Sequence, residues 1–250
     1  MRPEVVAHRG ASAHRAEHTL GAYELAIEQG ADAFECDVRV SRDGQLVCVH
    51  DRRIDRTSNG RGVVSELTVS RMAHLDFSGW HHQTHERGVL TLDALLGLAK
   101  DSSVRLFVET KHPVRYAGLV EAKLVALLAR HGLNAPEDKQ NSPVVMMSFS
   151  SAAVRRVREA APRVPTVLLF DRLPKRLGSG MLPPWADHAG PDVRLLRRHS
   201  DYVARAAEHG HDTYCWTVDD PADVELCARA GVRYVATNRP ADTRSRLDQG

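Results

Sequence analysis

The chain has 250 residues, of which 42% are hydrophobic, and a formal net charge of +2. This length fits one α/β barrel or two small domains, and the apolar content is enough for a sizeable core. The small net charge argues against nucleic acid as a partner, and no run of about 20 apolar residues predicts an integral membrane segment.

Apolar, β-rich segments alternate with helical patterns along most of the chain. In chain order, we predict parallel strands at 5–9, 33–38, 105–111, 144–149, 166–170, 192–196, 213–218 and 233–237. The segments between most of them predict helices at 21–31, 91–100, 117–132, 151–161, 200–210 and 221–231. Repeated β-α units imply a parallel sheet, and eight of them fit a TIM (β/α)8 barrel that spans residues 1–250 as a single domain.

A further strand-like segment, LVCVHD at 46–51, follows the second strand too closely for a parallel crossover. The pair Asp43-Gly44 predicts a β-hairpin instead. If these two residues alone form the turn, Asp37 faces His50 across the hairpin, whereas a longer turn shifts the pairing by one residue. The hairpin therefore brings a histidine back beside the carboxylates of the second strand.

Residues 52–90 show little periodicity beyond a short helix near 70–76. We expect them to form a small insertion beside the hairpin, on the face of the barrel that carries active sites.

The cysteines do not have the spacing of a metal site, and they fall within predicted strands and helices at Cys36, Cys48, Cys215 and Cys227. Buried free thiols suit a reducing compartment. Because the first strand begins close to Met1, with no secretory signal before it, we expect a cytoplasmic protein.

Charged side chains stand at the ends of several apolar strands, where burial is costly unless the charges are paired or bind a ligand. They are His8, Arg9, Glu35, Asp37, His50, Asp51, Glu109 and Lys111. A structural salt bridge explains any single one of them. Because the ends of parallel strands meet at one rim of a barrel, the whole set indicates a functional site there.

The residue types in this set match the needs of one reaction. The carboxylates Glu35, Asp37 and Glu109 suit a hard divalent cation such as Mg²⁺ or Ca²⁺. Arg9 and Lys111 supply positive charge for a phosphate. The two histidines suit a general acid and a general base, because imidazole titrates near neutral pH. Together these residues predict cleavage of a phosphate ester.

Several segments resemble the glycerophosphodiester phosphodiesterase family. Residues 7–51, AHRGASAHRAEHTLGAYELAIEQGADAFECDVRVSRDGQLVCVHD, are similar to its N-terminal signature. Further motifs follow in the family's order, namely RTSNGRGVVSELT, LTLDALLGLA, FVETK, MMSF, WTVDD and GVRYVATNRP. The resemblance covers nearly the whole chain except 171–198.

The resemblance implies a TIM barrel with a small insertion, one divalent cation (Mg²⁺ or Ca²⁺) as cofactor and a small glycerophosphodiester as substrate. It implies that Glu35, Asp37 and Glu109 bind the metal, that His8 and His50 are the acid–base pair, that Arg9 and Lys111 contact the phosphate, and that Glu17, Phe149 and Trp216 line the site. Glu17 is expected to hold a histidine or a metal-bound water. Core packing explains the two aromatic residues equally well.

The chain departs from the family pattern at three positions. His18 and Asp219 stand where the family has Asn, and Asn238 stands where it has Asp. We expect the change at position 18 to alter local hydrogen bonding. The residues assigned to metal, proton transfer and phosphate are all present, which predicts an active enzyme.

The predicted function is metal-dependent hydrolysis of glycerophosphodiesters to glycerol 3-phosphate and an alcohol. One alternative is lysophospholipase D-type hydrolysis of lysophospholipids, with residues 75–80 as an apolar entrance. A sugar isomerase is disfavoured because an uncharged sugar needs neither Arg9 nor Lys111. A non-catalytic barrel that binds phosphorylated metabolites is the alternative outside enzymes. The sequence leaves open the leaving alcohol, the metal, the roles of the two histidines, attack by water or by a glycerol hydroxyl, and the oligomeric state.

Overall fold

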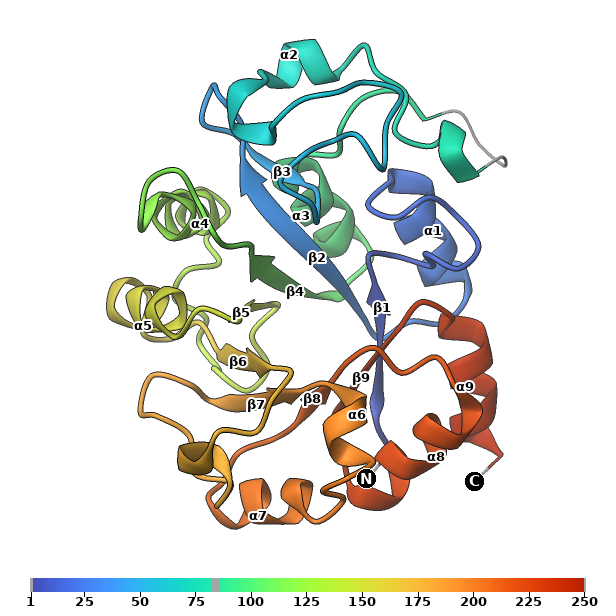
Figure 1. The fold of residues 1–250 in the computed structure, drawn as a ribbon, viewed down its shortest axis with the longest axis vertical. Helices are drawn as coiled ribbons and strands as arrows, with labels where there is room; N and C mark the ends of the chain where they lie inside the picture. The colour runs from blue at the N-terminus through green and yellow to red at the C-terminus, as the bar shows by residue number, and fades with distance from the viewer. Residues whose placement is uncertain (1, 82–85, 250) are drawn as a thin grey trace.

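The computed structural model describes residues 2–81 and 86–249 and confirms the predicted barrel (Figure 1). Its strands are β1 (Glu4–His8), β2 (Ala33–Val40), β3 (Leu46–Cys48), β4 (Arg105–Thr110), β5 (Val144–Ser148), β6 (Thr166–Phe170), β7 (His188–Pro191), β8 (Tyr214–Cys215) and β9 (Tyr234–Thr237). Its α-helices are α1 (Leu20–Glu28), α2 (Val69–Met72), α3 (Leu92–Asp101), α4 (Leu119–Arg130), α5 (Ser151–Ala160), α6 (Val193–Leu196), α7 (Tyr202–Glu208), α8 (Pro221–Ala230) and α9 (Pro240–Asp248). Three short 3-10 helices are η1 (Val64–Glu66), η2 (Gly79–His81) and η3 (Lys175–Leu177).

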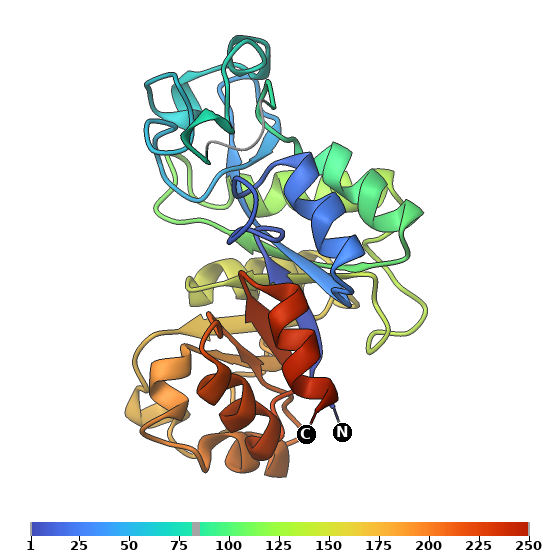
Figure 2. The same ribbon diagram turned by 90° about the vertical axis from the view of Figure 1, so that its right-hand side faces the viewer.

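The parallel strands follow the order β7-β6-β5-β4-β2-β1-β9-β8. Single parallel bridges, Ala189 with Thr213 and Asp192 with Trp216, link the two ends of this order and nearly close the barrel. Figure 2 shows helices around the strands and the insertion at one end of the molecule, away from both termini. In the described residues, we find no helix with the length and apolar character needed to span a membrane.

Several helices begin where a polar side chain accepts a hydrogen bond from the first turn. Thr19, Thr91 and Ser150 each accept one from the backbone N–H three residues later, at the starts of α1, α3 and α5. Asp220 does the same for the N–H of Ala222 before α8. Each such cap satisfies a backbone donor that the helix itself leaves unpaired, and so fixes where the helix starts.

Side chains at alternate positions of the strands point into the barrel. The ring of Phe107 lies 5.1 Å from that of Tyr214 and 5.0 Å from that of Tyr234, and these rings form part of an apolar interior cluster. A step of two residues keeps a side chain on the same face of a strand. This step leads from Val6, Ala33, Phe107, Met147, Tyr214 and Ala236 to His8, Glu35, Glu109, Phe149, Trp216 and Asn238. The interior row therefore changes from apolar to mostly polar at one rim.

The predicted sixth strand at 192–196 is wrong. The strand is β7, His188–Pro191, and the next residues form the short helix α6. The carboxylate of Asp192 accepts a hydrogen bond from the N–H of Arg194 at 2.8 Å and so begins the helix. A short apolar run alone does not distinguish a buried strand from a buried helical turn.

The predicted register of the hairpin is also wrong by one residue. Val38 pairs with Cys48, and the N–H of Val49 donates to the carbonyl of Asp37 at 3.0 Å, so Asp37 faces Val49 rather than His50. The turn is longer than two residues because Ser41 pairs with Gln45, with 2.9 Å between the N–H of Ser41 and the carbonyl of Gln45.

The insertion packs around its own small core against the hairpin. Val47 and Val49 of the hairpin contact Ile54, Met72 and other buried apolar residues of the insertion. The short helix expected near 70–76 is α2, Val69–Met72. The four cysteines are buried free thiols, as predicted.

Candidate active site

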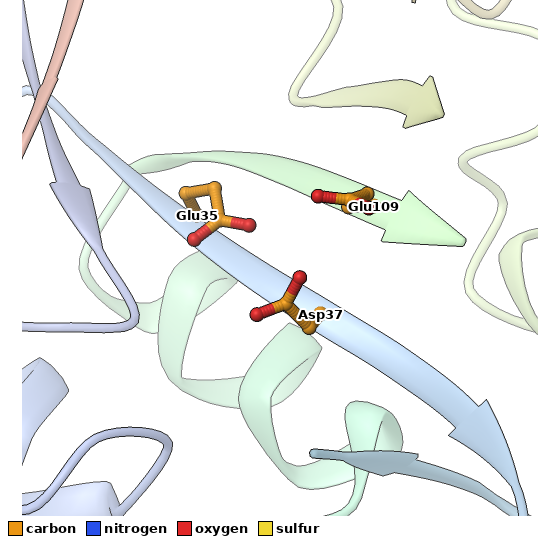
Figure 3. A group of neighbouring side chains, drawn as sticks. All are labelled: Glu35, Asp37 and Glu109. Carbon is orange, nitrogen blue, oxygen red and sulfur yellow. The ribbon is translucent and has the colours of Figure 1, made fainter. Parts of the chain in front are cut away.

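Three carboxylates converge at the polar rim of the barrel. Glu35 and Asp37 come from β2 and Glu109 from β4, where Asp37 and Glu109 are neighbours across the strand pair. Figure 3 shows the three side chains directed toward a common space. One oxygen of each lies within 4.8 Å of the others, and all three residues are buried. Three negative charges held this close repel one another unless positive charge offsets them.

Asp37 contacts two cationic side chains and a histidine. Its oxygens lie 3.0 Å from Arg9 Nε, 3.2 Å from Lys111 Nζ and 3.0 Å from His18 Nε2. Burial alone raises the pKa of a carboxyl, but these partners hold the pKa of Asp37 well below its ordinary value. Asp37 is therefore ionised at neutral pH.

The other two carboxylates are less well compensated. Burial, followed by the charge of Asp37, raises the pKa of Glu35 well above its ordinary value and raises that of Glu109 from 4.5 to about 7. Lys111 Nζ contacts Glu109 Oε1 at 2.7 Å and only partly offsets this effect. The cluster therefore has unbalanced negative charge whenever all three groups are ionised.

This donor set fits one hard divalent cation. Oδ1 of Asp37 is buried and has Lys111 Nζ at 3.2 Å, which leaves a lone pair of this oxygen for a cation. Carboxylate oxygens are the ligands that Mg²⁺ and Ca²⁺ prefer, and a cation among them offsets the charge that raises the pKa of Glu35 and Glu109.

His8 ends β1 and is held by a chain of hydrogen bonds. Its Nδ1 lies 2.8 Å from Oδ1 of Asn238, and Asn238 Nδ2 donates to Asp219 at 2.6 Å. Because the amide nitrogen faces the carboxylate, the amide oxygen faces His8 and accepts its Nδ1–H. The other nitrogen, Nε2, is left without a proton and lies 3.9 Å from Glu35 Oε2. Burial, followed by the charge of Arg9, lowers the pKa of His8 from 6.5 to about 3, so the ring is neutral.

Two of the three departures from the family pattern thus lie in one network. Asp219 and Asn238 exchange the amide and carboxylate of the family pattern between the same two positions. The Asp219 carboxylate also accepts from the backbone N–H of Asn238 at 2.7 Å and from Thr237 Oγ1 at 3.0 Å. The exchange leaves His8 beside a neutral amide oxygen instead of a carboxylate.

His50 follows the hairpin strand β3 and is more exposed. Its Nδ1 lies 2.7 Å from Asp51 Oδ1, and its side chain is 34% exposed. Arg56 Nε donates to the other oxygen of Asp51 at 2.6 Å. Burial lowers the pKa of His50, and the charges of Arg9 and Lys111 lower it further. The pKa of His50 therefore responds to charged residues of the same site, as that of His8 does.

Glu17 lies at the rim of the site and pairs with two arginines, where we expected a histidine or a bound water. Its carboxylate accepts from Arg9 at 3.2 Å and from both terminal nitrogens of Arg56 at 2.7 Å. Burial opposes ionisation, but the hydrogen bonds from Arg56 and the charge of Arg9 lower the pKa of Glu17 to about 2. Glu17 therefore orients Arg9 and joins it to the insertion.

The loop after β1 adopts an unusual backbone conformation. Arg9 and His18 both have φ of +60°, and the N–H of His18 donates to the carbonyl of Arg9 at 3.1 Å. Gly10 has φ of +83°, and a Cβ there would lie 2.7 Å from the backbone of Ala22. The glycine therefore allows the loop to approach α1 closely.

Phe149 and Trp216 lie at the rim as an edge-to-face pair, with ring centroids 5.2 Å apart. Trp216 Nε1 donates to the carbonyl of Gly190 at 2.9 Å, and Phe149 is 43% exposed. Lys111 Nζ lies 5.8 Å from the centroid of Phe149. The pair therefore forms an apolar wall beside the charge cluster, open to solvent on one side.

Sequence reasoning did not assign roles to His18, Asp219, Asn238 or Arg56. The same step of two residues that identifies the other rim residues leads from Ala236 to Asn238, so a signal for it was present. His18 offered no such signal, because its contact with Asp37 depends on the left-handed backbone of the loop before α1.

Comparisons with known proteins agree with the geometry. Residues 8–242 match the model of the glycerophosphoryl diester phosphodiesterase family. A relative from Mycobacterium tuberculosis, named "Probable glycerophosphodiester phosphodiesterase 1", is 49% identical, and the aligned region covers 99% of this chain and 93% of the relative. A solved glycerophosphodiester phosphodiesterase from Agrobacterium tumefaciens has a TM-score of 0.81 and 27% identity, with 97% of this chain and 99% of that chain covered. A phosphodiesterase from Oleispira antarctica, solved with the product sn-glycerol-3-phosphate, shares the fold, with a TM-score of 0.85, 23% identity, and 99% and 97% of the two chains covered.

Proposed function

The chain belongs to the glycerophosphoryl diester phosphodiesterase family, and on this premise we propose that it hydrolyses glycerophosphodiesters to glycerol 3-phosphate and an alcohol. The observation that carries the proposal is the set of side chains at one rim. Two imidazoles, each with Nδ1 bonded to a fixed partner, stand with Arg9 and Lys111 around three buried carboxylates.

Glu35, Asp37 and Glu109 are the proposed ligands of one divalent cation, Mg²⁺ or Ca²⁺. Such a cation offsets negative charge on phosphoryl oxygens and lowers the pKa of a hydroxyl or water that contacts it. Lys111 and Arg9 keep Asp37 ionised, so this carboxylate needs no deprotonation before it binds a cation.

Arg9 and Lys111 are the proposed phosphate contacts. Lys111 uses two of its three donors on Asp37 and Glu109, which leaves one N–H for a substrate oxygen. Arg9 contacts Asp37 through Nε and Glu17 through Nη1, so one terminal nitrogen keeps its donors. Because both side chains are already fixed by carboxylates, they can stabilise developing charge without being reorganised.

His8 and His50 are the proposed proton-transfer pair. Each has Nδ1 tied to an oxygen acceptor, so Nε2 is the nitrogen that faces a reactant. One imidazole takes a proton from the attacking oxygen, which belongs to water or to the neighbouring glycerol hydroxyl. The other imidazole starts doubly protonated and gives its Nε2 proton to the departing alcohol oxygen, so that the P–O bond breaks without releasing an alkoxide. Phe149 and Trp216 form the proposed apolar wall of the substrate pocket.

The test is release of glycerol 3-phosphate from glycerophosphocholine by the purified protein. It is run with EDTA and then with added Mg²⁺ or Ca²⁺, for the wild type and for Glu35→Ala. Glu208→Ala, at the exposed end of α7, is the matched control for loss of a carboxylate. We expect turnover that metal restores in the wild type and in the control but not in Glu35→Ala.

Two outcomes would redirect the proposal. Turnover that persists in EDTA, with no response to either cation, would rule out the metal while leaving the activity. No turnover of glycerophosphocholine by a folded protein, together with hydrolysis of lysophosphatidylcholine, would identify lysophospholipase D activity instead. Tight binding of glycerol 3-phosphate with no turnover of either compound would identify a binding barrel.

A further inference from the structure

A groove of about 420 Å³ lies beyond the carboxylate cluster, between the hairpin, the insertion and the loop that leads from β4 into α4. Figure 1 shows the far end of β2 reaching toward these segments. The backbone ties the walls together, because Arg42 N–H donates to the carbonyl of Leu67 at 2.8 Å and Val64 N–H donates to that of Arg52 at 3.0 Å. Backbone hydrogen bonds between the hairpin and the insertion therefore fix the shape of the groove.

Four arginines line this groove, contributed by all three walls. They are Arg39, Arg42, Arg52 and Arg115. Across residues 2–81 and 86–249, none of the four forms an ion pair, although most other arginines of the protein do. Glu66 is the single acidic residue among the lining residues. The groove thus holds an excess of positive charge that the protein itself does not neutralise.

The lining of the groove begins two residues along the chain from the candidate active site. Arg39 follows Asp37 by two residues on β2, and Pro113 of the groove follows Lys111 by two residues. In an extended chain this step is about 7 Å, which is within the length of one small diester. Arg39 Nε also donates to the backbone carbonyl of His50 at 3.0 Å, so the same residue contacts the proposed acid–base histidine and the groove.

We propose that this groove binds a second phosphate, carried by the leaving alcohol of the substrate. The inference rests on the proposed function, since it extends the same reaction to glycerophosphodiesters whose alcohol is itself a phosphate ester. Guanidinium groups suit this ligand because their paired N–H donors match two phosphate oxygens. Val40, Val114 and Leu119 give the groove apolar wall as well, which suits the carbon chain between two phosphates.

The test compares two substrates that differ in this feature. Glycerophosphoglycerol has an uncharged leaving alcohol, and bis(glycerophospho)glycerol has one that carries a second phosphodiester. We expect kcat/KM of the wild type to be about tenfold higher for the second compound, as a few partly exposed charge pairs would give. In Arg52→Gln/Arg115→Gln, this preference should fall to about one.

A double variant with the same loss of charge serves as the control. Arg53→Gln/Arg71→Gln removes two exposed arginines of the insertion that do not line the groove. Its substrate preference should equal that of the wild type. Equal kcat/KM for the two substrates in the wild type would overturn the proposal. So would a preference that survives in Arg52→Gln/Arg115→Gln or disappears in the control.

A binding measurement separates this proposal from the proposed function. Calorimetric titration of the same two diesters into His8→Ala, with and without the Arg52 and Arg115 substitutions, measures their affinities in the absence of turnover. About tenfold tighter binding of bis(glycerophospho)glycerol, lost in the arginine variant, supports the groove. If the wild type hydrolyses neither diester, the proposed function fails, and equal affinities for the two diesters would refute the groove as well.

Discussion

In His8 and His50, the ring nitrogen Nδ1 bonds to different kinds of partner. His8 stands on the barrel rim, where Nδ1 donates to the amide oxygen of Asn238 and the side chain is 15% exposed. His50 stands after the hairpin, where Nδ1 donates to the carboxylate of Asp51 and the side chain is 34% exposed. Both arrangements leave Nε2 free, and they differ in whether the partner carries charge.

The difference extends to how each region is stabilised. On the barrel rim, hydrogen bonds among partly buried groups link His8 to Asn238 and Asp219, and the neighbouring carboxylates are buried. On the hairpin, the ion pairs of Arg56 with Asp51 and Glu17 fix the position of His50, and Arg56 is 46% exposed. Buried networks are costly to disrupt, whereas exposed ion pairs contribute little and are screened by salt. The barrel rim should therefore be the rigid half of the site and the hairpin the adjustable half.

The largest expected effect is loss of either histidine. If both imidazoles move protons, His8→Ala and His50→Ala should each lower kcat by about 10² to 10⁴. Neither change should unfold the protein, because both side chains lie at the rim above the apolar interior. The measurement is the steady-state rate with glycerophosphocholine, alongside thermal unfolding followed by circular dichroism.

His209→Ala, at the exposed end of α7, controls for loss of an imidazole and should leave kcat unchanged. Retained activity in His50→Ala, with His8→Ala inactive, would contradict the paired mechanism and leave the barrel rim as the whole catalytic site.

The next effect concerns the buried charge of the barrel rim. Burial, then Asp37, raises the pKa of Glu109 from 4.5 to about 7. Between these two pH values, the folded protein keeps a proton that the unfolded chain has already lost. The free energy of unfolding should therefore fall as the pH rises from about 4.5 through about 7, by on the order of 3 kcal/mol from this group. Urea unfolding in EDTA across this window measures the decline.

Glu109→Gln isolates this contribution. Its free energy of unfolding should differ increasingly from that of the wild type as the pH rises across the same window. Added Mg²⁺ or Ca²⁺ should reduce the decline, since a cation at the carboxylates favours their ionised forms. Identical pH slopes for the wild type and Glu109→Gln would show that this group titrates at its ordinary pKa.

A smaller effect tests the amide on the barrel rim. Asn238→Asp alone places two carboxylates side by side at the 2.6 Å contact with Asp219. Asp219→Asn alone replaces one of the two oxygens that accept from Asn238 Nδ2 and from its backbone N–H with an amide donor, so one of these donors faces another donor. Each single change should destabilise the fold by about 1–3 kcal/mol. The double exchange restores one donor and one acceptor, so it should recover most of the loss. Urea unfolding of the three variants and the wild type gives the coupling free energy as a double-mutant cycle.

The double exchange of Asp219 and Asn238 also tests whether Asn238 is the hydrogen-bond partner of His8. In the double variant, a carboxylate faces Nδ1 as it does in His50, and the nearby negative charge should raise the pKa of His8. Nitrogen chemical shifts of the imidazole, measured against pH, report this change directly. Two results together would show that Asn238 does not hold His8. The losses of unfolding free energy in the two single variants would add up to the loss in the double variant, and the pH dependence of the imidazole nitrogen shifts would not change.

The fold could be predicted well wherever the apolar pattern was long. The prediction was wrong at β7, because the sequence HAGP has little β-propensity and becomes a strand through the neighbours that close the barrel. It also missed α9, Pro240–Asp248, whose short amphipathic pattern was weak. The hairpin register depended on Ser41, whose side chain bonds both Asp43 and Gln45 and lengthens the turn. Such side-chain contacts are not visible in a pattern of apolar residues.

The candidate site divides in the same way. Glu35, Asp37 and Glu109 could be predicted because the step of two residues along a strand fixes which side chains share a face. The partners of these residues across the barrel could not, since they depend on loop conformation. His18 reaches Asp37 only because the loop after β1 turns through residues with positive φ. Sequence reasoning therefore finds groups that strands position and misses groups that loops position.

The smallest expected effect probes the adjustable half of the site. Arg56→Gln removes exposed ion pairs to Glu17 and Asp51, so the free energy of unfolding should fall by less than about 1 kcal/mol, and the loss should shrink further in high salt. The loss in Asn238→Asp comes instead from partly buried groups in direct contact, which salt screens less, and should persist in salt. Urea unfolding of both variants at two salt concentrations makes the comparison, with Arg53→Gln as the control for an exposed arginine of the insertion. A salt-independent loss of several kcal/mol in Arg56→Gln would contradict the division into a rigid barrel rim and an adjustable hairpin. It would show that the ion pairs of Arg56 hold His50 as firmly as the contacts of the barrel rim hold His8.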